Sequence, residues 1–328
     1  MQSGTALGLT WGGYIPAEKA LQYSSVFTSN LNCEERDLEC LQSKSVDDII
    51  NQSDVLDIPE GLFTFAAAWM PVMDKDFTPD PFLIGNPMEL IESNQFNADV
   101  EVVIGTTKDE GLQFLLGVLF DPSLYEVYDA NWDVFGPMKI FNLGSPDDIN
   151  EVDIVNSRKI LNFYTNGDGH FSEEHFRGVV QMITDSFGLY GVHKAMKAFV
   201  STGMTVYHYI LTYEGDYSYL ELYGLPHLGV CHADDLIYLF RPIFDNSWNS
   251  SEPFLFGTDK EVSSTMTSAW TNFVAFGDPT PPSEAPHNSW LPVEQENFRY
   301  WNISGPFPQM EYSEVIAERM NFWFNLLG

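Results

Sequence analysis

The chain has 328 residues, of which 44% are hydrophobic and 15% aromatic, so it can bury a large core and is not intrinsically disordered. Its 47 acidic residues outnumber its 15 basic ones and give a net charge of −32, which repels phosphate backbones and argues against a nucleic-acid partner. No apolar run approaches the roughly 20 residues of a membrane span, and the N-terminus lacks the basic region of a signal peptide.

Helices are predicted first along the chain. Residues 17–30 have a helical pattern, and two shorter helical stretches follow, one around Cys40 and one at 46–51. The run PVMDKDFTPDPFLIGNP at 71–87 is expected to be extended or looped, because each proline forbids a helix through it. This part of the chain therefore passes from helices to an irregular segment.

Strands and helices alternate in the remainder. The β-branched run at 100–105 is typical of a buried parallel strand, and 205–213 and 298–303 predict two more strands. Helices are expected at 158–201, 262–276 and 312–327. The helix at 262–276 carries an apolar stripe formed by Val262, Met266, Ala269, Trp270 and Phe273. This alternation predicts an α/β fold, with a mostly parallel sheet flanked by helices on both faces.

Titratable side chains follow two of the predicted strands. Asp109 and Glu110 come just after the first, and His232 in GVCHADDLIYLF follows the second, before a helix whose first turn holds Asp234 and Asp235. Active sites gather at the carboxyl ends of parallel strands. Taken singly, however, a loop histidine is more often structural, and a glutamate after a strand is more often a helix cap.

The combination of motifs points further. MQSG, a short loop between cysteines, GTTKDEG, GVCHADDL and AWTNFVAFGDP occur in the order and spacing of type-B carboxylesterases and cholinesterases, which the chain resembles from Ser3 to the terminal FWFNLL. The resemblance implies that residues 1–328 are the C-terminal part of a single α/β-hydrolase domain. It also implies hydrolysis of small-molecule carboxylic esters without a cofactor, with Glu110 as the catalytic acid and His232 as the base.

The nucleophile that completes such a triad is not found. The G-x-S-x-G elbow is absent, and the glycines four apart enclose only Ala6 or Thr10 at their centre. Thr10 has only nine residues before it, too few for a strand in the middle of a sheet. In relatives the elbow serine lies upstream of the segment that reads QSG here, as do the oxyanion loop and the signal peptide. Met1 therefore looks internal to a longer, secreted protein, through either an incomplete gene model or a real truncation.

The resemblance also suggests residues that support the acid. Ser3 matches a serine that hydrogen-bonds the catalytic acid from behind. Asp185 matches a buried aspartate of the same surroundings, although a helix N-cap explains it equally well. Both are therefore expected near Glu110.

The substrate pocket can be inferred only in part. Phe65, Ala67 and Phe114 match positions on the acyl side of the family's pocket, and core packing is the rival explanation for each. Gln113 stands where cholinesterases carry an aromatic ring facing choline, and losing that ring removes a cation–π contact of about 1–2 kcal/mol. A general carboxylesterase is thus favoured over an acetylcholine-specific one.

Cysteines and sequons indicate an oxidising, secretory compartment. The spacing of Cys33 and Cys40 can close a small loop, and the pair matches a disulfide of the family, while Cys231 is left as a buried free thiol. Three N-x-S/T sequons are candidates for glycosylation, at Asn51, Asn249 and Asn302.

Other functions are less well supported. The seven histidines form neither H-E-x-x-H nor a Cys/His quartet, so no metal site is predicted. TNGDGHFSEEHF superficially suggests a calcium loop, but alignment on Gly169 puts Tyr164 and His175 where carboxylates are required. The rival function is a cholinesterase-like adhesion or binding module without catalysis, and an expressed, non-catalytic decoy is a third. The sequence does not determine the oligomeric state.

Overall fold

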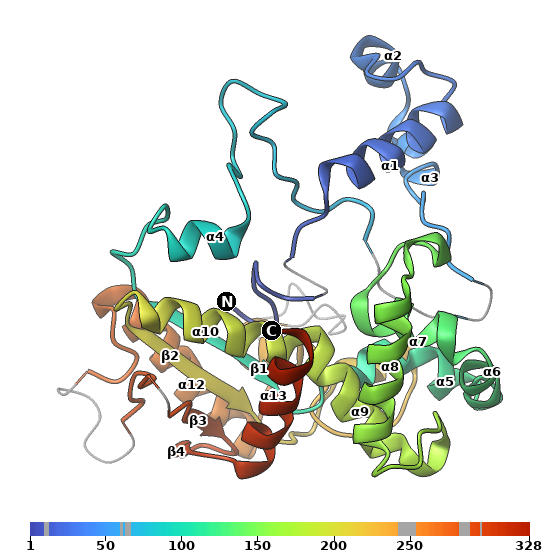
Figure 1. Ribbon diagram of the computed structural model, residues 1–328. Coiled ribbons are helices and arrows are strands. Elements are labelled where there is room, and N and C mark those ends of the chain that lie inside the picture. The colour runs from blue at the N-terminus through green and yellow to red at the C-terminus, as the bar shows by residue number, and fades with distance from the viewer. Residues whose placement is uncertain (10–12, 60–61, 63–66, 242–253, 282–288, 296) are drawn as a thin grey trace.

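In the part of the chain that the structure describes, four strands form the sheet that carries the candidate site (Figure 1). The computed structural model describes residues 1–9, 13–59, 62, 67–241, 254–281, 289–295 and 297–328. The strands lie side by side in the order β1 (Val102–Thr107), β2 (Val206–Leu211), β3 (Tyr300–Ile303) and β4 (Gln309–Glu311). The first three are parallel, and β4 is antiparallel to β3. All six residues of β1 and of β2 are buried, as the continuous apolar runs predict.

Helices and helical turns make up most of the remaining elements. Before β1 they are α1 (Ala17–Asn30), α2 (Leu38–Gln42), α3 (Val46–Asn51) and α4 (Pro87–Glu92). Between β1 and β2 they are η1 (Glu110–Leu115), α5 (Leu116–Phe120), α6 (Leu124–Ala130), α7 (Trp132–Phe141), η2 (Pro146–Asp148), α8 (Glu151–Tyr164), η3 (Glu173–His175), α9 (Phe176–Thr184), the π-helical η4 (Asp185–Leu189) and α10 (Tyr190–Ser201). After β2 they are η5 (Tyr219–Tyr223), α11 (Asp234–Leu239), α12 (Gly257–Phe276) and α13 (Glu314–Leu327).

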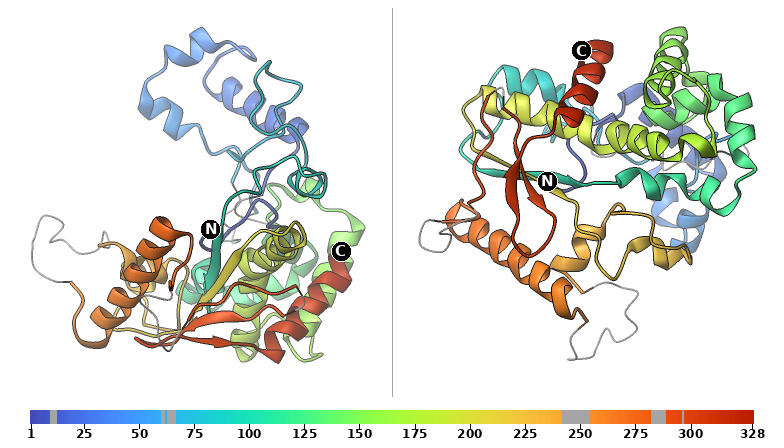
Figure 2. Two further views of the ribbon diagram at one scale, coloured as in Figure 1. Left: turned by 90° about the vertical axis from the view of Figure 1, so that its left-hand side faces the viewer. Right: turned by 90° about the horizontal axis from the view of Figure 1, so that it is seen from below.

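Helices cover both faces of the sheet, as expected. Alternate strand residues such as Tyr209 and Trp301 pack with α12 on one face, where Val262 and Met266 of the predicted stripe are fully buried. On the other face, Ile104 and its neighbours pack with α10. Figure 2, seen from below, shows α10 and α12 on opposite sides of the strands. α1 to α3 form a separate arm that stands away from the sheet in both figures.

The first residues of the chain pair with the free side of β1. Gln2 forms a parallel bridge with Gly105, and the Ser3 N–H donates to the Gly105 carbonyl over 2.9 Å. A side chain on Gly105 would lie 2.3 Å from the Tyr209 ring, so glycine is required there. This pairing holds Ser3 beside the end of β1.

Several predicted boundaries need correction. The helices at 17–30 and 46–51 are confirmed, whereas the first strand begins two residues later than predicted and runs to Thr107. The helix expected at 158–201 is broken after α8, because Gly167 and Gly169 adopt positive φ in the turn that follows. β4 was not anticipated, since its three residues carry no strand pattern. Among the described residues, no helix is long and apolar enough to cross a membrane.

Candidate active site

Glu110 and His232 lie at the same edge of the sheet. Glu110 begins η1 directly after β1, and His232 belongs to the loop between β2 and α11. The loops meet because β1 and β2 are parallel neighbours, so both chains leave the sheet at one edge. The Asp109 N–H donates to the Val230 carbonyl over 2.9 Å and ties the two loops together.

The two side chains form a short hydrogen bond. The Glu110 Oε2 atom lies 2.6 Å from His232 Nδ1. The other carboxylate oxygen, Oε1, accepts from Ser3 Oγ over 2.6 Å and from the Thr107 N–H over 2.8 Å. Glu110 is fully buried, and the His232 side chain is 21% exposed. The carboxylate is thus anchored on one oxygen and orients the imidazole with the other.

The carboxylates around His232 determine its charge. Burial alone would lower the pKa of His232, but Glu110, with help from Asp235 and Asp234, raises it above the ordinary value. The bond at Nδ1 also fixes the tautomer in which Nε2 carries the lone pair. An imidazole held in this way can accept a proton at Nε2 and be stabilised as the imidazolium.

Asp109 holds the backbone of the histidine loop, a role that the sequence did not indicate. Its Oδ2 atom accepts from the Val230 N–H over 3.2 Å, and its Oδ1 atom accepts from Gln181 over 3.2 Å. Gly229 has a φ of 150°, and a Cβ there would lie 2.5 Å from Asp109 Oδ2. The motif contained Asp109, but only the structure connects it to Val230.

Asp234 and Asp235 are buried rather than solvated at the start of α11. Asp234 accepts from the Cys231 N–H over 2.7 Å and from the Tyr219 N–H over 2.7 Å, and burial raises its pKa to about 7. Asp235 accepts from Tyr209 over 2.9 Å and from Gln2 over 2.8 Å. Because helix ends commonly carry exposed aspartates, the sequence alone gave no sign of this burial.

Asp185 lies in a different network from the one expected. It is fully buried in η4, where Tyr164 donates to it and Arg319 forms an ion pair with it at 2.8 Å. Burial raises the pKa of Asp185, and Arg319 opposes that rise. Gly188 is the residue of η4 that lies beside Glu110: a Cβ on Gly188 would be 3.9 Å from Glu110 Cγ. Asp185 is therefore neither a helix N-cap nor a direct partner of Glu110 or Ser3.

Two of the four expected pocket residues are close to the histidine loop. Phe114 is buried, with its ring centroid 5.6 Å from that of His232, and Phe187, which was not expected, stands at 5.4 Å. Gln113 donates to the Tyr223 hydroxyl over 3.2 Å.

The other two expected pocket residues do not contribute to the described surroundings of His232. Ala67 lines a separate cavity of ≈310 Å³, which residues of α1 and α7 also line. Phe65 and Thr10 lie outside the described residues.

The predicted disulfide is confirmed. Cys33 and Cys40 are bonded, with Cα atoms 5.8 Å apart, and Cys231 is a buried free thiol whose pKa is raised by burial. Within the ranges that the structure describes, no cluster of three potential metal ligands occurs.

The sequons differ in accessibility. Asn51 is exposed at the end of α3, and Asn249 lies outside the described residues. Asn302 is buried in β3 and accepts from Thr212 over 2.5 Å. We therefore withdraw Asn302 as a glycosylation candidate, because a bulky glycan needs a surface position.

The parallel strands flanked by helices, with Glu110 and His232 in the loops that follow β1 and β2, have the α/β-hydrolase fold. The described core agrees in fold with juvenile hormone esterase from Manduca sexta, at a TM-score of 0.75 and 21% identity over 99% of this chain and 59% of that structure. The chain belongs to the carboxylesterase family, whose family model matches residues 1–323.

Curated relatives extend beyond the matched region. The chain is 26% identical over 319 residues to a carboxylic ester hydrolase from Bombus ignitus, covering 94% of this chain and 53% of the relative. It is 25% identical over 226 residues to a juvenile hormone esterase from Tribolium castaneum, covering 65% and 37%. An acetylcholinesterase from Bungarus fasciatus is 23% identical, covering 97% and 49%. The chain thus spans about half the length of the curated relatives it matches, or less.

Proposed function

We propose that this chain supplies the acid and the base of a carboxylic ester hydrolase and that a serine outside it supplies the nucleophile. The observation that carries the proposal is the 2.6 Å bond between Glu110 and His232, with the far side of the carboxylate held by Ser3. The absence of a G-x-S-x-G motif from the 328 residues supports an external nucleophile. Residues 1–328 are then one part of a single α/β-hydrolase domain.

Each residue has a defined role in the reaction. His232 removes the proton of the serine hydroxyl as the oxygen attacks the ester carbonyl, and then delivers it to the leaving alcohol. Glu110 orients the ring and stabilises the imidazolium. Water hydrolyses the acyl-enzyme by the same route, and backbone N–H groups outside this chain hold the oxyanion.

The surroundings of His232 support a general ester substrate. Phe114 and Phe187 place two aromatic rings within 5.6 Å of the imidazole, measured between centroids, which suits an apolar acyl or alcohol group. Gln113 offers no aromatic face to a choline head. A net charge of −32 disfavours nucleic-acid partners. The Cys33–Cys40 disulfide and the exposed Asn51 sequon support a secreted glycoprotein.

An adhesion or binding module is the less favoured alternative. Such a module has no need of a fully buried carboxylate bonded to a partly exposed histidine. Perturbed groups of this kind gather at catalytic sites.

The test compares the 328-residue chain with a version extended toward its N-terminus, using p-nitrophenyl butyrate as the substrate. We expect activity from the extended protein alone, and His232→Ala should reduce its turnover by about 10⁶-fold. His227→Ala removes a histidine from the same loop and should leave turnover unchanged. If the short chain hydrolyses the ester in a His232-dependent way, the external nucleophile is wrong and Thr10 is mutated next. If the active extended protein tolerates His232→Ala, the base is wrong.

A further inference from the structure

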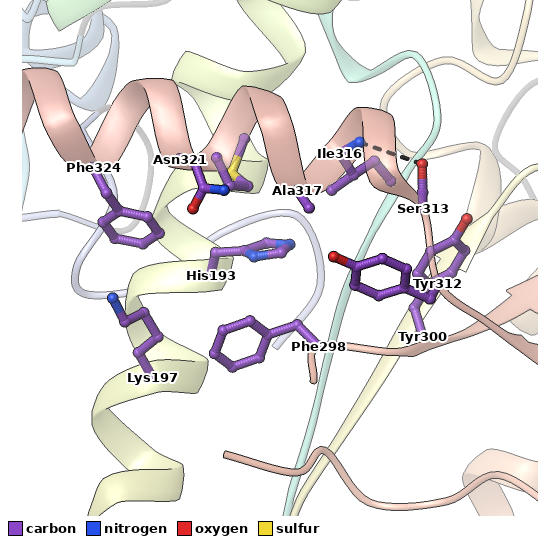
Figure 3. Close-up of a pocket in the computed structure, with 11 residues that line it drawn as sticks. His193, Lys197, Phe298, Tyr300, Tyr312, Ser313, Ile316, Ala317, Asn321 and Phe324 are labelled. Atoms are coloured by element: carbon purple, nitrogen blue, oxygen red, sulfur yellow. Dashed lines mark hydrogen bonds between the residues drawn. The ribbon is translucent and has the colours of Figure 1, made fainter. Parts of the chain in front are cut away.

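The C-terminal helix, α13, makes polar contacts on two sides. On one side it borders a cavity of ≈190 Å³, which Asn321 of α13 and His193 of α10 both line (Figure 3). Arg319 is not among the described residues that line this cavity. Its guanidinium lies against η4 and α9 instead, where it forms the ion pair with Asp185 and donates to Gln181 Oε1. α13 is thus bonded to a helix that flanks the histidine loop.

Two polar side chains of α9 support that loop. Arg177 donates to the Leu228 carbonyl over 2.8 Å. Gln181 donates from Nε2 to Asp109 Oδ1 over 3.2 Å, and Asp109 Oδ2 accepts from the Val230 N–H. Residues four apart in a helix lie on the same face. One face of α9 therefore holds the loop at two points just before the base.

The bonds from Arg319 toward the loop can run in only one direction. A guanidinium donates and never accepts, so it fixes the oxygen of the Gln181 amide toward itself. The amide nitrogen is then turned toward Asp109, whose ionised carboxylate only accepts. A reversed amide would place nitrogen against the guanidinium and oxygen against the carboxylate, and would lose both bonds. Arg319 thus sets the direction in which Gln181 donates.

Asp109 depends on this donor because it is 2% exposed. Burial raises its pKa, and Lys108 and Arg177 oppose that rise. The Lys108 ammonium lies 3.9 Å from Oδ2, beyond hydrogen-bond reach. A buried carboxylate that loses a donor is strongly disfavoured, so it moves or takes up a proton. Either change weakens its bond to the Val230 N–H.

We propose that Gln181 is a positioning residue for His232 and that Arg319 orients it. The relay formed by Arg319, Gln181 and Asp109 acts on the backbone of the histidine loop and touches no reacting atom. With the relay intact, the loop holds the His232 ring where the Glu110 carboxylate reaches Nδ1. The inference rests on the ester hydrolysis proposed above, because it assigns Gln181 to the same base.

An NMR titration of His232 tests the relay without requiring turnover. Burial lowers the pKa of His232 and Glu110 raises it, so a ring displaced from that carboxylate has a lower pKa. Gln181→Met keeps the length of the side chain, removes both hydrogen bonds and should lower the pKa of His232. Gln181→Glu adds a negative charge, which by itself would raise that pKa. Because it also sets a carboxylate against Asp109, it should lower the pKa as well.

Steady-state kinetics of an active extended protein give a second measurement. Gln181→Met should lower kcat by about tenfold and leave KM unchanged, because it displaces the base and leaves the substrate pocket intact. Gln95→Met is the matched control, since Gln95 is exposed and its amide bonds only Ser93 two residues away. In an Asp109→Asn background, Gln181→Met should lower kcat no further, because both residues act through one path.

Two variants of Arg319 test the orientation of the amide. Arg319→Lys keeps a cation that only donates, so the pKa of His232 should stay at its wild-type value. Arg319→Gln can face Gln181 in either direction and should lower that pKa, although the loss of a positive charge by itself would raise it.

The relay is overturned if Gln181→Met leaves the pKa of His232 at its wild-type value, whatever it does to the melting temperature. It is also overturned if Gln181→Glu raises that pKa, because position 181 then acts through charge alone. Equal pKa values in Arg319→Lys and Arg319→Gln would remove Arg319 from the relay. If the extended protein is inactive while Gln181→Met still lowers the pKa of His232, the ester hydrolysis is wrong and the relay stands.

Discussion

The Glu110 carboxylate lies 2.6 Å from one ring nitrogen of His232. Among the described residues, no carboxylate bonds to the ring of His193, which packs instead against the imidazole of His208. The outcomes are opposite: the pKa of His232 is raised, and that of His193 falls to about 3. Burial acts in the same direction on both rings. The difference teaches that a neighbouring carboxylate outweighs burial at His232, whereas burial, together with Arg319 and Lys197, keeps His193 neutral.

The largest effect should come from removing that acid. In an active extended protein, Glu110→Gln should reduce turnover by about 10⁴-fold, because the amide no longer stabilises the imidazolium or fixes the tautomer. His193→Phe should leave turnover unchanged. Steady-state kinetics on p-nitrophenyl butyrate measure both variants. An equal loss in the two would remove the distinction between the histidines.

The free energy of unfolding should also distinguish the two regions. Ser3→Ala leaves one oxygen of the fully buried Glu110 carboxylate with one donor fewer and should cost about 1–3 kcal/mol. His193→Phe should instead stabilise the chain, because it replaces an unpaired buried nitrogen with carbon. Urea unfolding measures both, with Ser201→Ala as a control whose hydroxyl bonds only its own helix. A stabilising Ser3→Ala would contradict the described role of that hydroxyl.

The last prediction concerns the pH dependence of the free energy of unfolding. The folded pKa of His193 is depressed, so its contribution to stability is present above its ordinary pKa of 6.5 and is lost as the pH falls toward about 3. For His232 the folded pKa is raised, so its contribution is full below 6.5 and is lost as the pH rises through the folded value. Between pH 8 and pH 4, the free energy of unfolding should therefore fall less steeply for His193→Phe than for the wild type. An equally steep fall in both proteins would mean that His193 already has a proton acceptor in the fold.

Much of the fold could be predicted from local patterns. The helix at 17–30 was predicted correctly, and the stripe of α12 was recognised because Val262, Met266 and Ala269 recur at the helical period and are buried. The predicted first strand stops at Gly105, a residue typical of turns, but β1 continues through Thr106 and Thr107, which are both buried. β4 could not be predicted, because its three residues depend on pairing with β3.

The sequence by itself determined the fold class, the Cys33–Cys40 pair and the two titratable residues in the loops that follow two strands, since order and spacing along the chain carry that information. Only the tertiary structure decided which buried charges meet. It placed Asp185 with Arg319 rather than with Glu110, and it tied Asp109 to the loop of His232. The physical reason is that a buried carboxylate needs a donor or a cation within about 3 Å. The nearest one is set by how helices and loops pack, not by distance in sequence.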